Sequence, residues 1–274
     1  MFSDPEYNPE ADPELRDHAV LLRDDARELV LLGMEDLRRD HGSDDDFNDL
    51  VIDYNLAEVT DAAGRVKQID GSLSVKAIGA ALRNGFAIGL PVAAGGDESV
   101  SRTLSGSEIT GSGLTASGGR SLLSVFEDPR SLLQSSTVGF VNTEAGEGAV
   151  ASDTLYLSVV LSGAQYLEDL APYDPFIVIG GDEQMEVHLP GREPSVRARL
   201  DLLNTGDDAS ESSGYYRTAS HLSWAINLVS SWQHPLERVP LVQAYPDFAA
   251  WAASAGAEYA NWYSNSRSGL VFSP

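Results

Sequence analysis

Five aspartates stand close together in the stretch GSDDDFNDLVIDYN, residues 42–55. Asp44, Asp46 and Asn48 alternate along the chain, and Asp49 follows directly. A hard cation such as Ca²⁺ takes about 6 to 8 oxygen ligands, and alternating Asp and Asn side chains on a turning chain supply several of them. Because like charges repel and Asp is a poor strand former, this density of carboxylates needs either a bound cation or a very salty solvent.

The acidic loop does not follow the pattern of an EF-hand. The sixth position counted from Asp44 is Asp49 rather than Gly, and the twelfth is Asn55 rather than Glu. A ligand from outside the loop is therefore expected, and Glu35 or Asp36, just upstream, is the natural candidate. The alternative, a solvated acidic loop without an ion, stays open on composition alone.

Motifs for catalysis are missing from the sequence. It contains no His-Glu-x-x-His, no Gly-x-Ser-x-Gly, no phosphate-binding Gly-x-x-x-x-Gly-Lys-Ser/Thr and no cysteine. The Gly-x-Gly-x-x-Ala at residues 111–116 lies in a Gly/Ser-rich stretch, without the strand and helix that a dinucleotide site requires. The histidines show no metal-ligand spacing: His18, His41, His188, His221 and His234. We therefore predict a protein that is not an enzyme.

The overall charge narrows the classes of partner. The 274 residues carry 42 acidic and 18 basic side chains, a formal net charge of −24, which disfavours nucleic acid and anionic membrane as partners. Lys67 and Lys76 are the only lysines, and this depletion, with carboxylates spread over the chain, is typical of adaptation to molar salt. With 42% hydrophobic residues the chain can still build a core. We expect a halophilic archaeon or one of its viruses as the source.

The elements that position the acidic loop are predicted to be strands. Residues 1–14 read as an acidic extended arm, and residues 15–37 fit one helix or two strands, of which we favour a strand ending at Glu35. Alternation of apolar and polar residues predicts strands across 47–91, with turns at Gly64 and Gly71. Residues 92–120 suit a long loop or a weak edge strand. Further strands are predicted at 121–127, 137–142 and 153–161 and in the apolar run PFIVIGG.

A helix is expected near the C-terminus, where apolar residues from Phe248 to Tyr259 follow helical spacing. The fold class that results is mainly β: an antiparallel, jelly-roll-like β-sandwich with a short C-terminal helix and long Gly/Ser loops. We predict one such domain over residues 15–274. A second acidic stretch at 204–214 lacks alternating partners for Asp207 and Asp208, so we interpret it as a loop first and a weak ion site second.

MEDLRRDHGSDDDFNDLVIDYN resembles the FEDL…GDxDFNDLVVDYN signature of the LruC-type domain family. The stretches VKAIGAALRNGFAIGLP, VHLPGREPS, SGYYRTASHLSWAINL and HPLERVPLVQAYPDFAAWAASAG extend the resemblance, in the same order, over roughly residues 30–265. It implies a single β-rich, calcium-associated domain of secreted and surface proteins, without established catalysis. Carried over residue by residue, the metal ligands are Glu35, Asp44, Asp46, Asn48 and Asp49, with Ca²⁺ favoured over Mg²⁺. Met34 and Ser43 replace the family's Phe and Gly.

The expected function is that of a structural or interaction component of an extracellular assembly, with protein partners and a homo-oligomeric state. The chain begins at Met1 with neither the basic nor the apolar region of a signal peptide. We therefore favour a virion component of a haloarchaeal virus, such as a capsid decoration, turret or tail protein. The alternative is a cell-surface adhesin or lectin-like module that binds a surface glycan, although Trp224, Trp232, Trp251 and Trp262 fit a core better than a sugar platform.

Overall fold

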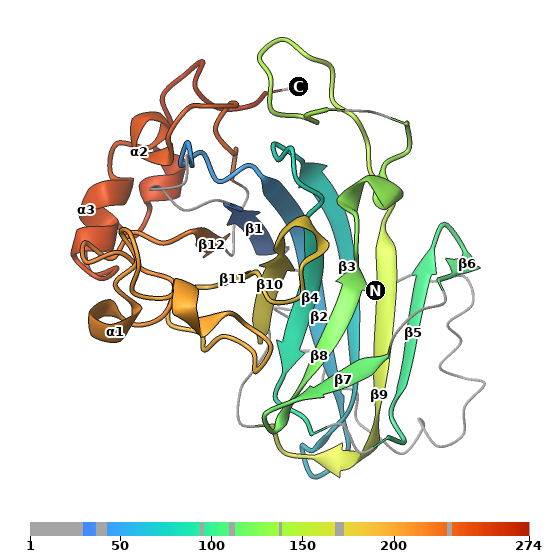
Figure 1. The fold of residues 1–274 in the computed structure, drawn as a ribbon. Helices are drawn as coiled ribbons and strands as arrows, with labels where there is room; N and C mark the ends of the chain where they lie inside the picture. Colours follow the sequence, from blue (N-terminus) through green and yellow to red (C-terminus); the bar gives the residue numbers. More distant parts are fainter. Residues whose placement is uncertain are drawn as a thin grey trace.

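Two antiparallel β-sheets form the body of the protein in this computed structural model (Figure 1). The structure describes residues 30–36, 43–93, 96–109, 113–136, 139–167, 173–228 and 232–273. The predicted acidic arm at residues 1–14 lies outside the described residues, as do His18 and His41. The predicted fold class, a mainly β antiparallel sandwich with a short C-terminal helix, is confirmed.

The larger sheet has seven strands. In spatial order these are β12 (Ala225–Leu228), β1 (Val30–Met34), β2 (Leu50–Thr60), β3 (Val66–Ala77), β9 (Leu155–Gln165), β5 (Ser99–Leu104) and β6 (Ser107–Glu108). The strand predicted to end at Glu35 is therefore β1. Strands β2 and β3 form a long hairpin, and Gly64, with a φ of 78°, lies in its turn as predicted.

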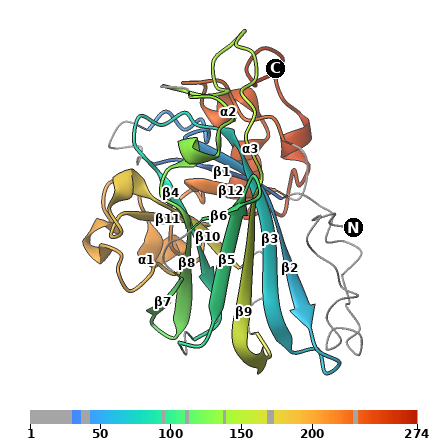
Figure 2. The ribbon, with the colours of Figure 1, turned by 90° about the vertical axis from the view of Figure 1, so that its right-hand side faces the viewer.

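The smaller sheet has five strands, and Figure 2 shows it beside the larger one. Its order is β11 (Glu186–His188), β10 (Asp174–Val178), β4 (Gly85–Leu90), β8 (Arg120–Phe126) and β7 (Leu114–Ser117). Short helical turns lie between and after the strands: η2 (Pro129–Leu132), η3 (Ile179–Gly181), η4 (Leu200–Leu202), α1 (Ser210–Ser213), α2 (Leu241–Ala244), α3 (Phe248–Ala253) and η5 (Trp262–Ser264). No helix in the described ranges is long and apolar enough to cross a membrane.

The main hydrophobic core lies between the two sheets. Alternate residues of β9 point into it, so Leu155, Leu157 and Val159 are buried while Tyr156 and Val160 are exposed. This is the period of two that predicted the strand at 153–161. Burial of these side chains removes apolar surface from water and is the main force that holds the sheets together.

Two details of the predicted strands are wrong. Gly71 is not in a turn but in the middle of β3, where it pairs with Leu56 of β2 and Leu157 of β9. A Cβ at this position would lie 2.7 Å from the Leu56 side chain and 3.0 Å from that of Leu157, so glycine makes room for both. In the described part of 137–142 there is no strand, and Val141 forms a single antiparallel bridge to Ile78.

A second hydrophobic core lies on the outer face of β12, β1 and β2. Residues 232–273, which we call the C-terminal cap, carry α2, α3 and η5 and cover this face (Figure 1). Leu31 and Val51 point outward into the cap, whereas their neighbours Leu32 and Ile52 point inward, and all four are buried. Strand segments covered on both faces need apolar residues at successive positions, which explains the apolar runs of β1 and of the first three residues of β2, Leu50–Ile52.

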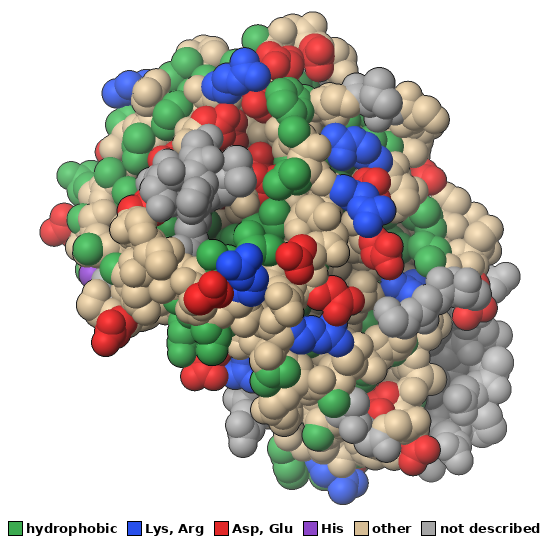
Figure 3. Space-filling model, viewed as in Figure 1, with side chains coloured by type: hydrophobic (Ala, Val, Ile, Leu, Met, Phe, Trp, Pro, Cys, Tyr) green, Lys and Arg blue, Asp and Glu red, His purple; other side chains and the backbone are tan. Residues whose placement is uncertain are grey.

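Acidic side chains are scattered over the face seen in Figure 3, among Lys and Arg side chains, and do not form one continuous patch there. The concentration of carboxylates in the acidic loop is therefore a local feature and differs from this general surface charge.

Candidate metal centre

The register of β1 and β2 brings the acidic residues together. Met34, the last residue of β1, pairs with Leu50, the first of β2, so Glu35 and Asp49 leave the same end of the sheet. Residues 43–49, which we call the acidic loop, lie beside α2 of the cap (Figure 1). Strand pairing thus makes neighbours of Glu35 and Asp49, although these residues are well separated in the sequence.

Three of the predicted ligands form a compact group. One carboxylate oxygen from each of Glu35, Asp44 and Asp46 lies within 4.8 Å of the other two. Two oxygens bound to one Ca²⁺, each at about 2.3–2.6 Å, can be up to about 5 Å apart, so the spacing fits ligands of a common ion. Glu35 is 0% and Asp46 1% exposed, which means that these carboxylates have lost contact with bulk water.

Hydrogen bonds fix the carboxylates in this arrangement. The backbone N–H of Phe47 and the hydroxyl of Ser43 donate to the two oxygens of Glu35, the latter over 2.7 Å. Asp46 accepts from the N–H of Asn48 through Oδ1, at 3.1 Å. Phe47 has a φ of 56°, which turns the loop sharply, and its ring packs edge-on against Phe248 of α3 at 5.9 Å.

The carboxylates are electrostatically uncompensated within the described part of the chain. Burial, followed by the charge of Asp44, raises the pKa of Asp46 to about 8, and burial, followed by the charges of Glu35 and Asp36, raises that of Asp49 to about 10. Burial and the charge of Asp46 also raise the pKa of Glu35 well above its ordinary value.

Within the described residues, no basic side chain forms an ion pair with Glu35, Asp46 or Asp49. Burial raises the pKa of Asp44, and the charge of Arg238 opposes this rise only in part, since the Arg238 side chain is 74% exposed and therefore well screened. Buried charges normally persist only when paired or bound to a metal, so this donor set fits a hard cation.

The other two predicted ligands, Asn48 and Asp49, also form hydrogen bonds with the backbone. The Nδ2 group of Asn48 donates to the carbonyl of Pro235 at 3.1 Å, and its Oδ1 lies 1.8 Å from where a Cβ of Gly79 would be. Asn48 therefore bonds the acidic loop to the cap, while its Oδ1 is buried and has no hydrogen-bond partner within the described residues, and its role as a metal ligand stays a prediction. Asp49 accepts the N–H of Asp36 at 2.7 Å and borders the group.

Sequence reasoning missed Glu237, a further acidic residue at this site. Its side chain is 7% exposed, and within the described residues its Oε2 has no hydrogen-bond partner. Burial, followed by the charge of Asp44, raises its pKa to about 7, and its charge in turn raises the pKa of Asp46. Glu237 belongs to the cap, far along the chain, and the acidic motif gave no signal for it.

The remaining sequence candidates do not form a second group of this kind in the described ranges. Asp208 accepts the N–H groups of Asn204 at 2.7 Å and Ser210 at 3.0 Å, so it stabilises the 204–214 loop. His188 lies between two carboxylates, and His234 bonds the carbonyl of Asn142. Three of the four tryptophans are buried in the two cores: Trp224, Trp232 and Trp262.

Comparison with solved structures gives a similar fold in a crystal structure titled "Putative lipoprotein from Bacteroides ovatus". The TM-score is 0.68, the sequence identity is 18%, and the similarity covers 89% of this chain and 75% of the other. At this identity the similarity concerns the fold alone. No curated protein matches the chain.

Two family models match the sequence in succession. Residues 1–57 match the family described as a domain of unknown function, DUF4114, and residues 64–263 match another so described, DUF4842. The matches meet at the β2–β3 hairpin, and strands from both share the seven-stranded sheet. Because the second match spans well over half of its length, the chain belongs to the DUF4842 family.

Proposed function

We propose that the protein is a non-enzymatic, calcium-stabilised structural or interaction domain of an extracellular assembly. The observation that carries this proposal is the group of buried oxygens from Glu35, Asp44 and Asp46, within 4.8 Å of one another and without an ion pair to Glu35 or Asp46 from a described basic side chain. A divalent cation at this point offsets the repulsion among the carboxylates and thereby stabilises the native state.

The position of the group supports a structural role for the ion. The acidic loop is bonded to the cap through the N–H of Arg238 to Oδ2 of Asp46, at 2.8 Å, and through the N–H of Leu241 to the carbonyl of Asp45, at 2.7 Å. An ion held there fixes the loop on which the cap rests. Ca²⁺ suits the site better than Mg²⁺, because Ca²⁺ accepts irregular sets of oxygens and Mg²⁺ demands near-octahedral geometry.

For the assembly itself we propose a virion of a haloarchaeal virus, with other proteins or further copies of this chain as partners. The alternative is a cell-surface adhesin or lectin-like module that binds a glycan. The protein of similar fold from Bacteroides ovatus is titled "Putative lipoprotein", and this title supports a surface location for the present protein as well. The LruC-type resemblance of the acidic motif points to the same extracellular setting.

Thermal unfolding in molar KCl tests the ion. We expect Ca²⁺ to raise the unfolding midpoint and a chelator to lower it, with Mg²⁺ less effective; at a hundredfold excess over the dissociation constant the gain is about 2.7 kcal/mol. Asp46→Asn should lose the response to Ca²⁺ yet keep the stability of the chelated wild type, because Asn resembles the protonated carboxyl in shape. Asp97→Ala, in an exposed loop, is the matched control and should respond as the wild type does. A wild type indifferent to chelator would refute the proposal.

A further inference from the structure

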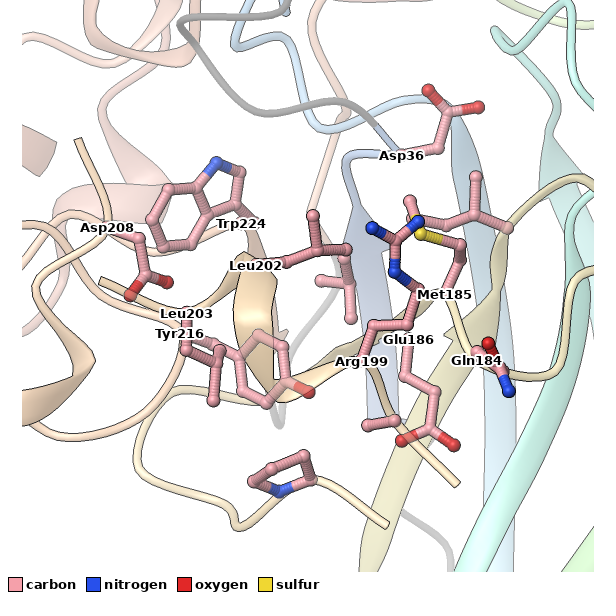
Figure 4. Close-up of a pocket in the computed structure, with 14 residues that line it drawn as sticks. Asp36, Gln184, Met185, Glu186, Arg199, Leu202, Leu203, Asp208, Tyr216 and Trp224 are labelled. Atoms are coloured by element: carbon pink, nitrogen blue, oxygen red, sulfur yellow. The ribbon is translucent and has the colours of Figure 1, made fainter. Parts of the chain in front are cut away.

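A cavity of about 400 Å³ lies between η4, the segment before β11, and the region around Trp224. In Figure 4, Trp224 and Asp208 lie on one side, Met185 and Arg199 on the other, and Leu202 between them. Small-molecule sites typically occupy about 300–1,000 Å³.

The wall of the cavity is mainly apolar. It is lined by Ile179, Met185, Val187, Leu202, Leu203, Tyr216 and Trp224. Pro194 and Ala198 add two more apolar side chains. Binding of a ligand here would be favourable, because it would remove both this apolar surface and that of the ligand from water.

The charged side chains around the cavity are already bonded within the protein. Glu186 accepts from His188 at 3.0 Å and from the hydroxyl of Ser195 at 2.6 Å. Arg199 pairs with Asp201 at 3.1 Å. These groups need no charged partner from a ligand.

Two further carboxylates at the cavity are bonded in the same way. Asp208 accepts two backbone N–H groups, and Asp36 accepts from Asn84 at 2.8 Å. With Glu186, three carboxylates line the cavity against one guanidinium, that of Arg199, which is itself paired with Asp201, so the lining offers an anion no unpaired basic side chain.

We propose that this cavity binds a neutral, mainly apolar small molecule. The site differs from the metal centre, although the two are neighbours: Asp36 lines the cavity, while Glu35, the preceding residue, contributes to the carboxylate group. The backbone N–H of Glu35 also donates to the carbonyl of Trp224, at 2.9 Å. Binding in the cavity does not require that the carboxylates hold calcium.

Titration with N-phenyl-1-naphthylamine, a neutral apolar fluorophore, tests the site in the full chain with Ca²⁺ and molar KCl present. We expect saturable binding with one site per chain. Leu202→Trp and Met185→Trp each place a larger side chain in the cavity, and each should weaken binding at least about tenfold, because the indole occupies space that the probe needs. Leu200→Trp adds the same side chain two residues away, at a position 61% exposed, and should bind as the wild type does.

Two further measurements complete the test. The anionic analogue 8-anilinonaphthalene-1-sulfonate should bind more weakly than the neutral probe; equal or tighter binding would overturn the assignment of a neutral ligand. A crystal structure with the neutral probe should place it against Leu202 and Trp224, whatever the folding of the variants. The site itself would be overturned if the probe bound elsewhere or without saturation. It would also be overturned if Leu202→Trp and Met185→Trp both bound the probe as tightly as the wild type does.

Discussion

His188 is a buried ionisable residue, 1% exposed, outside the candidate metal centre. Its Nδ1 lies 3.0 Å from Oδ2 of Asp174 and its Nε2 3.0 Å from Oε2 of Glu186, so both ring nitrogens face carboxylates. The ring is stacked between Phe176, at 4.2 Å, and Tyr216, at 5.1 Å. Burial by itself lowers the pKa of His188, but the bonds and charges of the two carboxylates outweigh it, and the pKa is raised above 6.5. The imidazolium thus ties β10 to β11.

Stability should consequently fall as the pH rises above neutrality. A histidine whose pKa is higher in the folded than in the unfolded protein stabilises fully below pH 6.5 and loses this contribution as the pH passes its folded pKa. His188→Gln should lose this part of the pH dependence and, by leaving two buried carboxylates without their cation, cost about 3–5 kcal/mol. Unfolding by urea from about pH 6 to about pH 9 measures both effects.

The control for this prediction is His221→Asn, at a half-buried histidine whose φ of 62° Asn tolerates. It should keep the alkaline fall of the wild type. An unchanged alkaline fall in His188→Gln would mean that other groups cause it.

At the scale of elements, the sequence correctly predicted those strands whose pattern depends only on residues close together in the chain. Alternation along residues 153–161 suffices to identify β9, because each buried position is two residues from the next. Gly71 could not be assigned, since its role depends on Leu157 of another strand. Glu35, Asp44 and Asp46 were found through a local motif, whereas Glu237 was not, because its segment meets the loop through contacts such as Arg238 to Asp46, 192 positions apart.

The contact between the acidic loop and the cap makes a prediction about local opening. Without calcium, repulsion among the loop carboxylates should loosen the amides that bond the two, notably the N–H groups of Arg238 and Leu241. Hydrogen exchange read by mass spectrometry should accelerate at least about tenfold in peptides from 232–273 and 43–49 when calcium is chelated, as expected for a local opening equilibrium shifted by about 1.4 kcal/mol. Peptides from β3 and β9 should keep their rates.

Asp46→Asn should show the exchange pattern of the chelated protein even with calcium present. A uniform acceleration across all strands would instead mean that calcium stabilises the whole fold without a special role at the cap. Unchanged cap peptides would separate the cap from the metal centre altogether.

On the scale of the whole molecule, the net charge of −24 acts on every element at once. The sheets and cap pack the chain compactly, and this brings the carboxylates closer together than in the unfolded chain. Self-repulsion therefore destabilises the folded state at low ionic strength. At about 0.1 M salt charges interact over about 10 Å, and at about 1 M over about 3 Å, so molar salt removes most of this repulsion.

With calcium held saturating, raising KCl from about 0.1 M to about 2 M should raise the unfolding midpoint by at least about 5 °C, with most of the rise complete by about 1 M. A variant with four exposed carboxylates replaced, Asp97→Lys, Glu108→Lys, Glu127→Lys and Glu147→Lys, should show a smaller rise, because each replacement changes the net charge by two units. All four side chains are exposed and none belongs to the group formed by Glu35, Asp44 and Asp46, so the calcium response should persist. An equal rise in both proteins would assign the salt effect to strengthened apolar burial and not to screened charge.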